Sequence, residues 1–345
     1  MPRHVTIKDV AKEAGVSFKT VSNVLNSTGS MRDSTRERVE NAIVKLGYTV
    51  NLSARSLKTG TTGLIGLSIF DFSQPFAPYL SDQVIDYARQ RGYGVIVNTY
   101  GQGGAGLASV MDNAAMLAPD GWFVFIDQPL ANEGALLEQP YPLVVASDYE
   151  TYDRVDKVTM PNVEGVRQAT GRLLDAGCRN IALFGACEGN RDYDYYMNAT
   201  EGTQEMRVRG YILAFEERGL RPDMDMLFSW GLMMSDSGVR AVNHMLKQGV
   251  RPDAIVCLND AMAIGVLHGL EANGLHVPED VQLIGYDNVP EAQFSNPSLT
   301  TVDPHVSDYV KCGIDMLIER IQGYEGPIRT YCTDFELIER GSTRL

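Results

Sequence analysis

The sequence predicts two kinds of structure: a small all-α module at the N-terminus, then a larger α/β part with two lobes built on parallel sheets. Apolar residues recur at helical spacing through residues 5–46, whereas short apolar runs alternate with helical segments from residue 62 onward. Charge separates the same two parts. Residues 1–60 hold ten Lys and Arg and five Asp and Glu, a net charge of +5, so the rest carries −19 and the whole chain −14. A basic head on an acidic body is typical of a protein that binds a polyanion locally.

The first predicted helix lies in the stretch VTIKDVAKEAG, residues 5–15. Thr6 is placed to cap it, with Asp9 three residues on as its capping-box partner. Gly15 falls where the chain must reverse, because glycine adopts a positive φ without strain. The apolar face consists of Ile7, Val10, Ala11 and Ala14.

A second helix follows, capped by Ser17 and packed through Val21, Val24 and Leu25. A small residue at Ala11, the turn glycine and an apolar Val21 have the spacing of a helix-turn-helix, whose second helix enters the major groove of DNA. The alternative is an ordinary αα-hairpin at the start of a globular domain. The positive charge and the polar outer face favour DNA.

The outer face of the second helix supplies the candidates for reading DNA. Lys19 suits a guanine edge or a phosphate, and Asn23 suits bidentate pairing with adenine. Hydroxyl side chains nearby are candidate phosphate contacts. The predicted DNA-contacting residues are Thr6, Ser17, Phe18, Lys19, Thr20, Ser22, Asn23, Asn26, Ala54 and Leu57.

A third helix and a linker complete the N-terminal part. Ser34 to Glu37 reads as a capping box that opens a helix closed by Gly47. Residues 51–60 then predict a helix of two turns, too short to be stable alone, which folds when two copies pair on DNA. Its Leu57 is placed to wedge a minor-groove base step. The alternative for this segment is a plain linker.

From residue 62 on, strands and helices alternate. The predicted strands are 64–70, 94–100, 121–126, 143–146, 180–184, 254–258 and 281–285, and the predicted helices are 79–91, 108–117, 163–176, 207–218, 236–248 and 261–273. Repeated βα units with apolar strands imply parallel sheets covered on both faces. Two such runs imply two lobes with a cleft, where a ligand lies at the carboxyl ends of the strands.

The cysteine content and the length of the apolar runs indicate the cellular compartment and the cofactors to expect. Five scattered cysteines without CxxC spacing predict reduced thiols, not disulfides or a zinc site. No signal peptide and no apolar run of membrane-spanning length is present, so we expect a cytoplasmic protein with no membrane partner, no metal and no cofactor.

A nicotinamide-dependent enzyme is the chief rival from another class. Residues 101–106, GQGGAG, match G-x-G-x-x-G literally. The fingerprint belongs after the first strand of its unit, with an acid closing the next strand, whereas this match follows the second strand and Asp120 precedes the next. No Ser/His/Asp order, HExxH or P-loop points to another enzyme.

Several motifs resemble the LacI/GalR family of bacterial transcription regulators over essentially the whole chain. They are VTIKDVAKEAGVS, TVS-x-VLN, STRERVENAIVKLGY, N-x-x-A-R-S-L, R-x-x-G-Y from Arg207, L-N-D from Leu258, I-G-Y-D from Ile284, P-x-L-T-T-V from Pro297 and E-R-G-S-T from Glu339.

The resemblance implies a homodimeric repressor of carbohydrate-utilisation genes that binds a near-palindromic operator in double-stranded DNA. Residues 1–50 are then the DNA-binding domain, 51–61 the hinge helix and 62–345 a two-lobed domain similar to periplasmic binding proteins. Lobe 1 covers about 62–161 and 304–333, and lobe 2 about 162–303 and 334–345. A small effector in the cleft, expected to be a sugar, changes the lobe angle, separates the hinge helices and alters DNA affinity.

Matched motifs also place the effector site. Arg207, Asn259 and Asp287 offer fixed donors and acceptors for vicinal hydroxyls, while Phe76 and Trp230 offer flat apolar faces. Asp148, or its neighbour Ser147, follows a predicted strand end and adds a contact.

Three departures from the family pattern stand out. Asn23 stands where members often have arginine, which indicates a different half-site. The chain ends at Leu345 directly after the last motif, so a dimer without the tetramerisation tail of some members is expected. Residues 188–198 form an extra segment, whose Tyr193, Tyr195 and Tyr196 either close over an oligosaccharide as a flap or pack on the lobe surface.

Two other effectors stay open within the same class of regulator. One is a purine corepressor, and the other is a phosphorylated protein that contacts the lobe surface.

Overall fold

The computed structural model describes residues 5–25, 31–48, 60–101, 118–130 and 137–345. The chain divides into two compact units, Met1–Thr62 and Gly63–Leu345. Several predictions lie outside the described residues: the hinge helix with Ala54 and Leu57, the DNA contact Asn26, the helix at 108–117 and most of the GQGGAG stretch.

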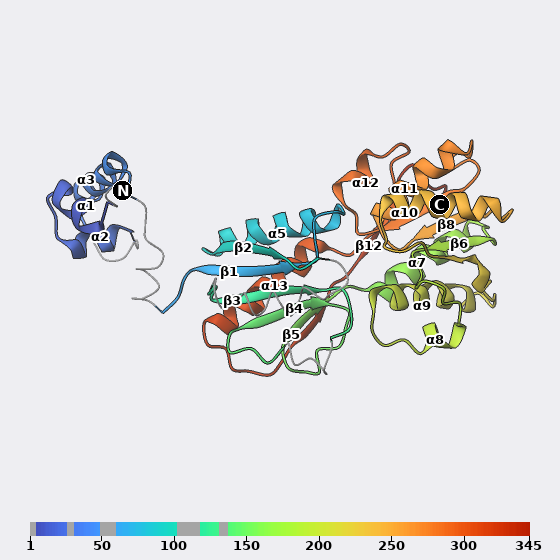
Figure 1. Ribbon diagram of the computed structural model, residues 1–345, viewed down its shortest axis with the longest axis horizontal. Helices are drawn as coiled ribbons and strands as arrows, with labels where there is room; N and C mark the ends of the chain where they lie inside the picture. The colour runs from blue at the N-terminus through green and yellow to red at the C-terminus, as the bar shows by residue number, and fades with distance from the viewer. Residues whose placement is uncertain (1–4, 26–30, 49–59, 102–117, 131–136) are drawn as a thin grey trace. The chain divides into compact units, whose positions relative to one another are not determined.

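Unit 1 is a three-helix bundle of α1 (Ile7–Ala14), α2 (Phe18–Leu25) and α3 (Asp33–Leu46) (Figure 1). The predicted capping box on α1 is confirmed, since the Thr6 amide donates to Asp9 Oδ2 at 2.9 Å and the Asp9 amide donates to Thr6 Oγ1 at 3.4 Å. Gly15 ends the helix with a φ of +62°, as expected. The buried core of the unit is Val10, Ala11, Ala14, Val21, Val24, Val39 and Ala42.

The start of the third helix corrects the sequence prediction. Helix α3 begins at Asp33, with Arg32 at the cap position and no side-chain cap bond. Ser34 therefore lies inside the first turn, where its hydroxyl is past the position from which a side chain caps a helix. The predicted capping box from Ser34 to Glu37 is wrong, whereas the predicted closing Gly47 is confirmed with a φ of +61°.

Unit 2 contains two six-stranded sheets. The first sheet, with the helices that cover it, is called lobe 1 and has the order β11-β5-β4-β3-β1-β2, in which every described pair is parallel. Its strands are β1 (Leu64–Ile69), β2 (Gly94–Thr99), β3 (Gly121–Ile126), β4 (Leu143–Ser147), β5 (Asp156–Thr159) and β11 (Thr330–Cys332), and its helices include α5 (Phe76–Gln90) and α13 (Val306–Ile321).

The second sheet, lobe 2, has the order β12-β10-β9-β8-β6-β7, parallel except for the β10–β12 pair. Its strands are β6 (Ile181–Phe184), β7 (Leu227–Phe228), β8 (Ala254–Cys257), β9 (Gln282–Tyr286), β10 (Thr300–Asp303) and β12 (Glu336–Ile338). Its helices are α7 (Asn162–Asp175), α8 (Tyr193–Met197), α9 (Thr203–Glu216), α10 (Ser235–Lys247), α11 (Asp260–Ala272) and α12 (Pro290–Phe294), with a 3-10 turn at Met224–Met226.

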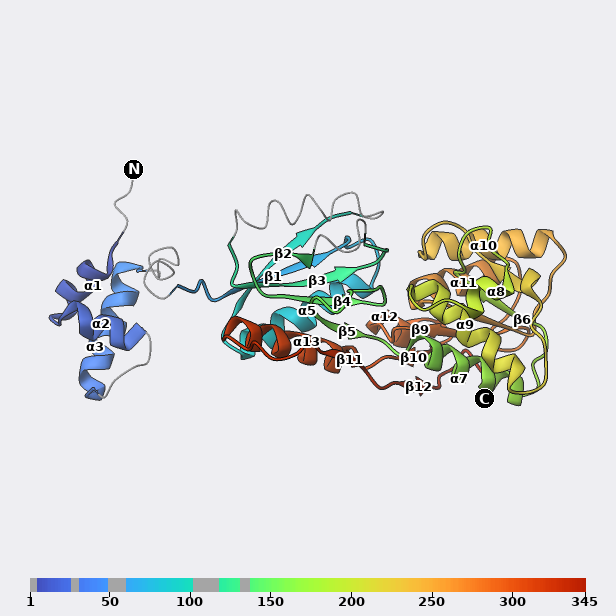
Figure 2. The same ribbon diagram turned by 90° about the horizontal axis from the view of Figure 1, so that it is seen from below.

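The chain passes between the two sheets three times: after β5, after β10 and after β11. Both views show the two sheets of unit 2 side by side along these connections (Figures 1 and 2). The predicted fold class, a helical N-terminal part followed by a two-lobed α/β part with parallel sheets, is confirmed. Among the helices of the described ranges, none combines the length and the apolar character that crossing a membrane requires.

Candidate functional site

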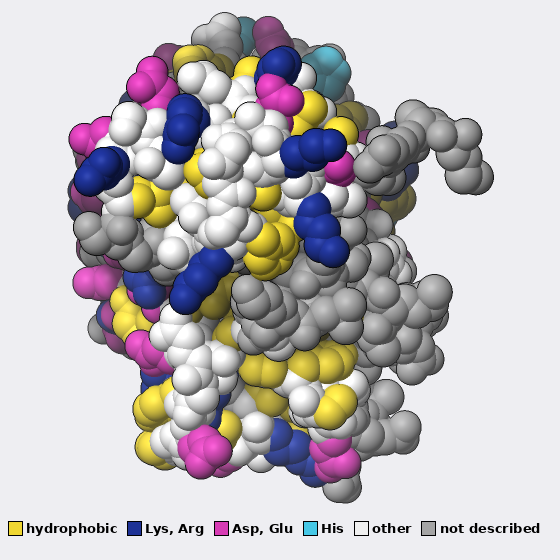
Figure 3. Space-filling view, turned by 90° about the vertical axis from the view of Figure 1, so that its left-hand side faces the viewer, with side chains coloured by type: hydrophobic (Ala, Val, Ile, Leu, Met, Phe, Trp, Pro, Cys, Tyr) yellow, Lys and Arg dark blue, Asp and Glu magenta, His cyan; other side chains and the backbone are white. Residues whose placement is uncertain are grey.

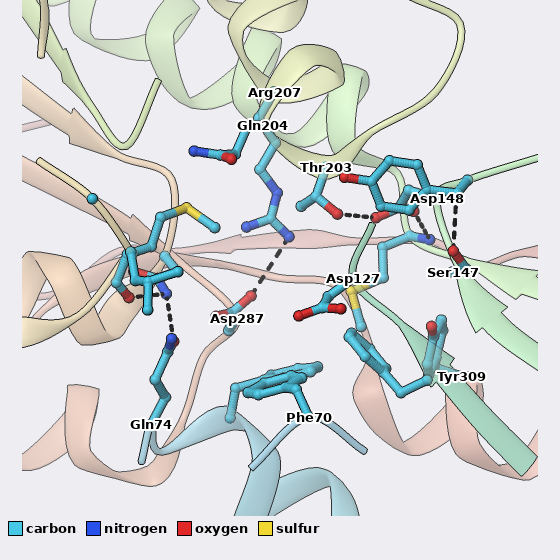
Figure 4. Close-up of a pocket in the computed structure, with 18 residues that line it drawn as sticks. Phe70, Gln74, Asp127, Ser147, Asp148, Thr203, Gln204, Arg207, Asp287 and Tyr309 are labelled. Carbon is cyan, nitrogen blue, oxygen red and sulfur yellow. Dashed lines mark hydrogen bonds and ion pairs between the residues drawn. The ribbon is translucent and has the colours of Figure 1, made fainter. Parts of the chain in front are cut away.

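A cavity of about 190 Å³ lies between the two lobes at the carboxyl ends of their strands (Figure 4). From lobe 1 it is reached by Phe70, directly after β1, and Asp127, directly after β3. From lobe 2 it is reached by Arg207 on α9 and by Asp287, directly after β9. Parallel strands bring these separate segments together because their carboxyl ends share one edge of each sheet.

Arg207 is the most constrained side chain of the cavity. Its Nε donates to Asn162 Oδ1 at 2.7 Å, and Nη1 donates to the carbonyl of Leu258. Its Nη2 lies 3.6 Å from Asp287 Oδ1, and the guanidinium carbon sits 3.6 Å from the ring centroid of Tyr286. A buried guanidinium held from several sides presents its charge in one direction, which suits a fixed donor for a ligand.

Asp287 is a buried carboxylate on a strained backbone. Its φ is +111°, a value that non-glycine residues rarely adopt and that clusters at functional sites. The surrounding fold holds it there, partly through its own amide, which donates to the carbonyl of Val302 at 2.9 Å. Burial raises the pKa of Asp287 to about 7, although the neighbouring Arg207 works in the opposite direction. Near neutral pH this carboxyl therefore exists in both protonation states.

Two polar contacts join the lobes across the cavity. Asn259, which caps α11 by accepting from the Met262 amide, donates through Nδ2 to Gln74 Oε1 at 3.2 Å. Asp148 accepts from Thr203 Oγ1 of lobe 2 at 2.7 Å with one carboxylate oxygen, while Thr159 Oγ1 of its own lobe donates to the other at 2.5 Å. Gln74 and Asp148 lie on opposite sides of the cavity in Figure 4, so the lobes are connected at both sides.

Aromatic rings of lobe 1 supply the apolar surface of the cavity. The centroid of Phe125 lies 5.6 Å from that of Phe70 and 5.9 Å from that of Phe76. Asp127 stands beside them, where burial raises the pKa of its carboxyl and Tyr100 donates a hydrogen bond to it at 3.1 Å. The cavity thus combines an aromatic side from lobe 1 with polar side chains that converge from both lobes.

The structure brings together five of the six predicted effector residues around this cavity: Phe76, Asp148, Arg207, Asn259 and Asp287. Trp230 is not among its lining residues. Its ring packs against His244 with centroids 4.9 Å apart, while the next two residues, Gly231 and Leu232, line the cavity in its place.

Sequence reasoning missed several residues that line the cavity, among them Phe70, Gln74, Phe125, Asp127 and Tyr309. Asp127 had a usable signal, because it follows a predicted strand as Asp148 does. Tyr309 had none, because the predicted elements end at residue 285, before α13.

The extra segment packs on lobe 2 instead of covering the cavity. Tyr196 is fully buried, Tyr193 donates to Glu216 of α9, and Tyr195 donates to Glu205 of α9 at 3.1 Å. None of the three tyrosines lines the cavity. The structure therefore contradicts the hypothesis of a tyrosine flap and favours the packed alternative, because each hydroxyl already has a partner on its own lobe.

Helix α2 of unit 1 has the arrangement expected of a recognition helix. Val21 and Val24 are buried, whereas Lys19 is exposed and Phe18 is 46% exposed. The hydroxyls of Ser17 and Thr20 lie 2.9 Å apart at the start of the helix. The remaining predictions for unit 1 place Thr6 at the cap of α1 and Ser22 and Asn23, both half-buried, on α2. Figure 3 shows several exposed Lys and Arg side chains in the view from this side.

Comparison with known proteins agrees with both parts of the chain. Residues 6–51 match the model of bacterial regulatory proteins of the lacI family, and residues 170–343 match a periplasmic binding protein-like domain. The chain is 32% identical over 346 residues to the HTH-type transcriptional repressor PurR of Glaesserella parasuis serovar 5, covering 98% of each protein. It is 33% identical over 307 residues to catabolite control protein A of Priestia megaterium, covering 87% of each.

Solved structures agree as well. A LacI-type transcription regulator from Bifidobacterium animalis subsp. lactis is 59% identical, with a TM-score of 0.79, over 82% of this chain and all of that one. The transcriptional regulator CelR, solved as a cellobiose complex, is 26% identical with a TM-score of 0.71 over 98% of this chain and 99% of that one.

A helix-turn-helix unit joined to a two-lobed α/β unit is the domain organisation of a DNA-binding transcription regulator. The chain belongs to the LacI family of bacterial regulatory proteins. The resemblance inferred from its motifs is confirmed.

Replacing Asp287 with asparagine removes a specific pH dependence of stability. The carboxyl has a pKa of 3.8 when free and about 7 in the fold. Folding therefore takes up a proton between these values, and this group's contribution to stability is lost as pH rises through that window. We expect the difference in unfolding free energy, wild type minus Asp287→Asn, to fall from about pH 4 to about pH 7 and then level off. Urea unfolding at a series of pH values measures it, and a difference independent of pH would contradict the assigned environment.

Replacing Lys19 with alanine tests the recognition helix. An operator is first obtained by selecting bound sequences from random duplexes. We expect Lys19→Ala to weaken binding of that operator about tenfold, because an exposed lysine on this helix contacts a base edge or a phosphate. The matched control is Lys311→Ala, which removes an exposed lysine on α13 of unit 2. Equal affinities for the two variants would rule out Lys19 as a contact.

Proposed function

We propose that this protein is a homodimeric repressor of carbohydrate-utilisation genes whose operator affinity is controlled by a sugar bound between the lobes of unit 2. The observation that carries the proposal is the composition of the cavity. Its aromatic side suits the C–H face of a sugar ring, and its fixed polar side chains suit the hydroxyls.

The size of the cavity supports a small ligand. At about 190 Å³ it is smaller than the pockets of roughly 300–1,000 Å³ that take drug-sized ligands. A single pyranose ring suits this space. The polar groups around it are of both kinds, since Arg207 donates, Asp127 accepts and Gln74 does both, as vicinal hydroxyls require.

The charge of the cavity supports a neutral ligand. Arg207 is balanced by Asp287 at 3.6 Å, and a second carboxyl, Asp127, stands on the opposite lobe. An anionic ligand is disfavoured, because the Arg207 guanidinium is already paired with Asp287. The relative solved as a cellobiose complex supports the same class of ligand.

Control of DNA binding follows from the position of the ligand between two lobes. A sugar that contacts both lobes favours the arrangement in which they are closed, because only that arrangement offers all the contacts at once. If the closed and open arrangements differ in operator affinity, binding of the sugar changes the affinity for the operator. The size of this change is limited by the ratio of the sugar's affinities for the closed and the open arrangement.

A purine is the second candidate effector. The rings of Phe70 and Phe76 each lie within 6 Å of the Phe125 ring on the lobe 1 side, and aromatic side chains of this kind suit a flat aromatic ligand. The phosphorylated protein partner requires no cavity, so the cavity favours either small molecule over it.

Thermal unfolding of the purified chain with mono- and disaccharides, purines and NAD(H) tests these alternatives. A ligand at about a hundredfold its Kd adds roughly 2.7 kcal/mol to the stability of the unit that binds it. We expect a shift with one class of sugar. The shift is lost in Asp287→Ala and kept in Asp86→Ala, which removes an exposed carboxylate of α5 that lies outside the cavity.

The other outcomes separate the alternatives. A shift with purines alone overturns the sugar proposal in favour of the second candidate, and a shift with NAD(H) alone overturns both. No shift with any ligand would contradict small-molecule control and favour a protein corepressor.

A further inference from the structure

A second depression, of about 510 Å³, lies beside the central cavity in lobe 2. Gly231 lines both, so the two spaces are contiguous at that residue. Leu227 and Phe228 of β7 contribute an apolar surface to the depression. Residues 187–191 also line it, as do Arg240 and His244 of α10.

Trp230 belongs to this depression and gives it an aromatic platform. The indole is 37% exposed, which is unusual for a large apolar ring, and its position is fixed by packing on His244 at 4.9 Å. An exposed and immobilised aromatic ring next to a ligand cavity is suited to the apolar face of a sugar.

The charged groups of the depression are largely compensated. Arg191 pairs with Asp225 at 2.5 Å, and Arg240 pairs with Asp236 at 2.8 Å. Glu188 adds one further negative charge to the wall. The depression therefore favours a neutral ligand with several hydroxyls over a phosphate or another anion.

The wall formed by residues 187–191 is held in place by the segment that follows it. The carbonyl of Asn190 accepts from the Tyr196 hydroxyl at 3.1 Å, and the Asn190 side chain accepts from the Asp192 amide at 2.9 Å. Tyr193 ties the same segment to α9. The tyrosines thus act as anchors for a wall, because their hydroxyls bond within lobe 2 while residues 187–191 face the depression.

We propose that this depression is a second sugar subsite, which binds the next ring of a disaccharide or longer oligosaccharide whose terminal ring occupies the central cavity. In this arrangement the glycosidic bond between the two sugar rings lies beside Gly231. This residue has no side chain to block the passage, and its φ is +70°. The subsite rests on the proposed sugar effector, and it adds the chain length of the sugar and the residues that select it.

Calorimetric titration of the full chain tests the subsite. The probes are glucose, galactose and xylose, together with cellobiose, maltose, lactose and xylobiose. We expect at least one disaccharide to bind about tenfold more tightly than its own monosaccharide, as stacking of the second ring on Trp230 implies. Trp230→Ala removes this advantage and leaves the affinity for the monosaccharide unchanged. Arg240→Ala, a milder change one turn of α10 away from His244, reduces the same advantage.

Phe294→Ala is the matched control, because it removes a ring of lobe 2 that is 81% exposed and lines neither space. Its affinity for every sugar is expected to equal that of the wild type. A disaccharide advantage that survives in both wall variants, or a disaccharide bound no better than its monosaccharide, overturns the subsite while the sugar effector stands. No binding by any sugar overturns the sugar effector and the subsite together.

Discussion

The carboxylate of Asp148 connects the two lobes, since it accepts from Thr159 in its own lobe and from Thr203 in the other. Across the cavity, the Gln74–Asn259 hydrogen bond makes the second such connection. A neutral hydrogen bond contributes about 0.5–1.5 kcal/mol net and one to a charged group about 1.5–3 kcal/mol, so these bonds hold the lobes together by only a few kcal/mol. A small ligand that adds a similar number of contacts is therefore enough to change the balance between closed and open lobes.

Two charged side chains of the cavity, Arg207 and Asp287, are buried, and each of them is held by fixed partners in the fold. Arg207 is buried, yet its guanidinium is held by Asn162, the Leu258 carbonyl and the charge of Asp287, and it lies over the ring of Tyr286. Asp287 lies on a backbone with a φ of +111°, so the fold holds the carboxyl in place at a conformational cost. These groups are pre-positioned before a ligand arrives, and pre-positioning lowers the entropy lost on binding.

Much of this architecture was predictable from the sequence, because the fold repeats a few strong local patterns. The capping box at Thr6, the turn at Gly15 and the strand–helix alternation each follow from residue type and spacing. The start of α3 was not predictable, since its cap position is Arg32, which is not one of the residue types that usually cap a helix. In the cavity, Asp148 was predictable because it follows the end of a predicted strand, and Asp127 could have been predicted for the same reason. That the Trp230 ring packs on His244 and does not line the cavity was not predictable, because the two residues lie far apart in the sequence.

If a sugar between the lobes controls operator binding, the affinity of the protein for DNA depends on the concentration of that sugar. Fluorescence anisotropy of a labelled, selected operator gives the Kd for DNA at increasing concentrations of the sugar that binds. We expect the Kd to change between about five- and 150-fold as the sugar saturates unit 2. A sugar that binds to the protein and leaves the operator Kd unchanged would contradict it.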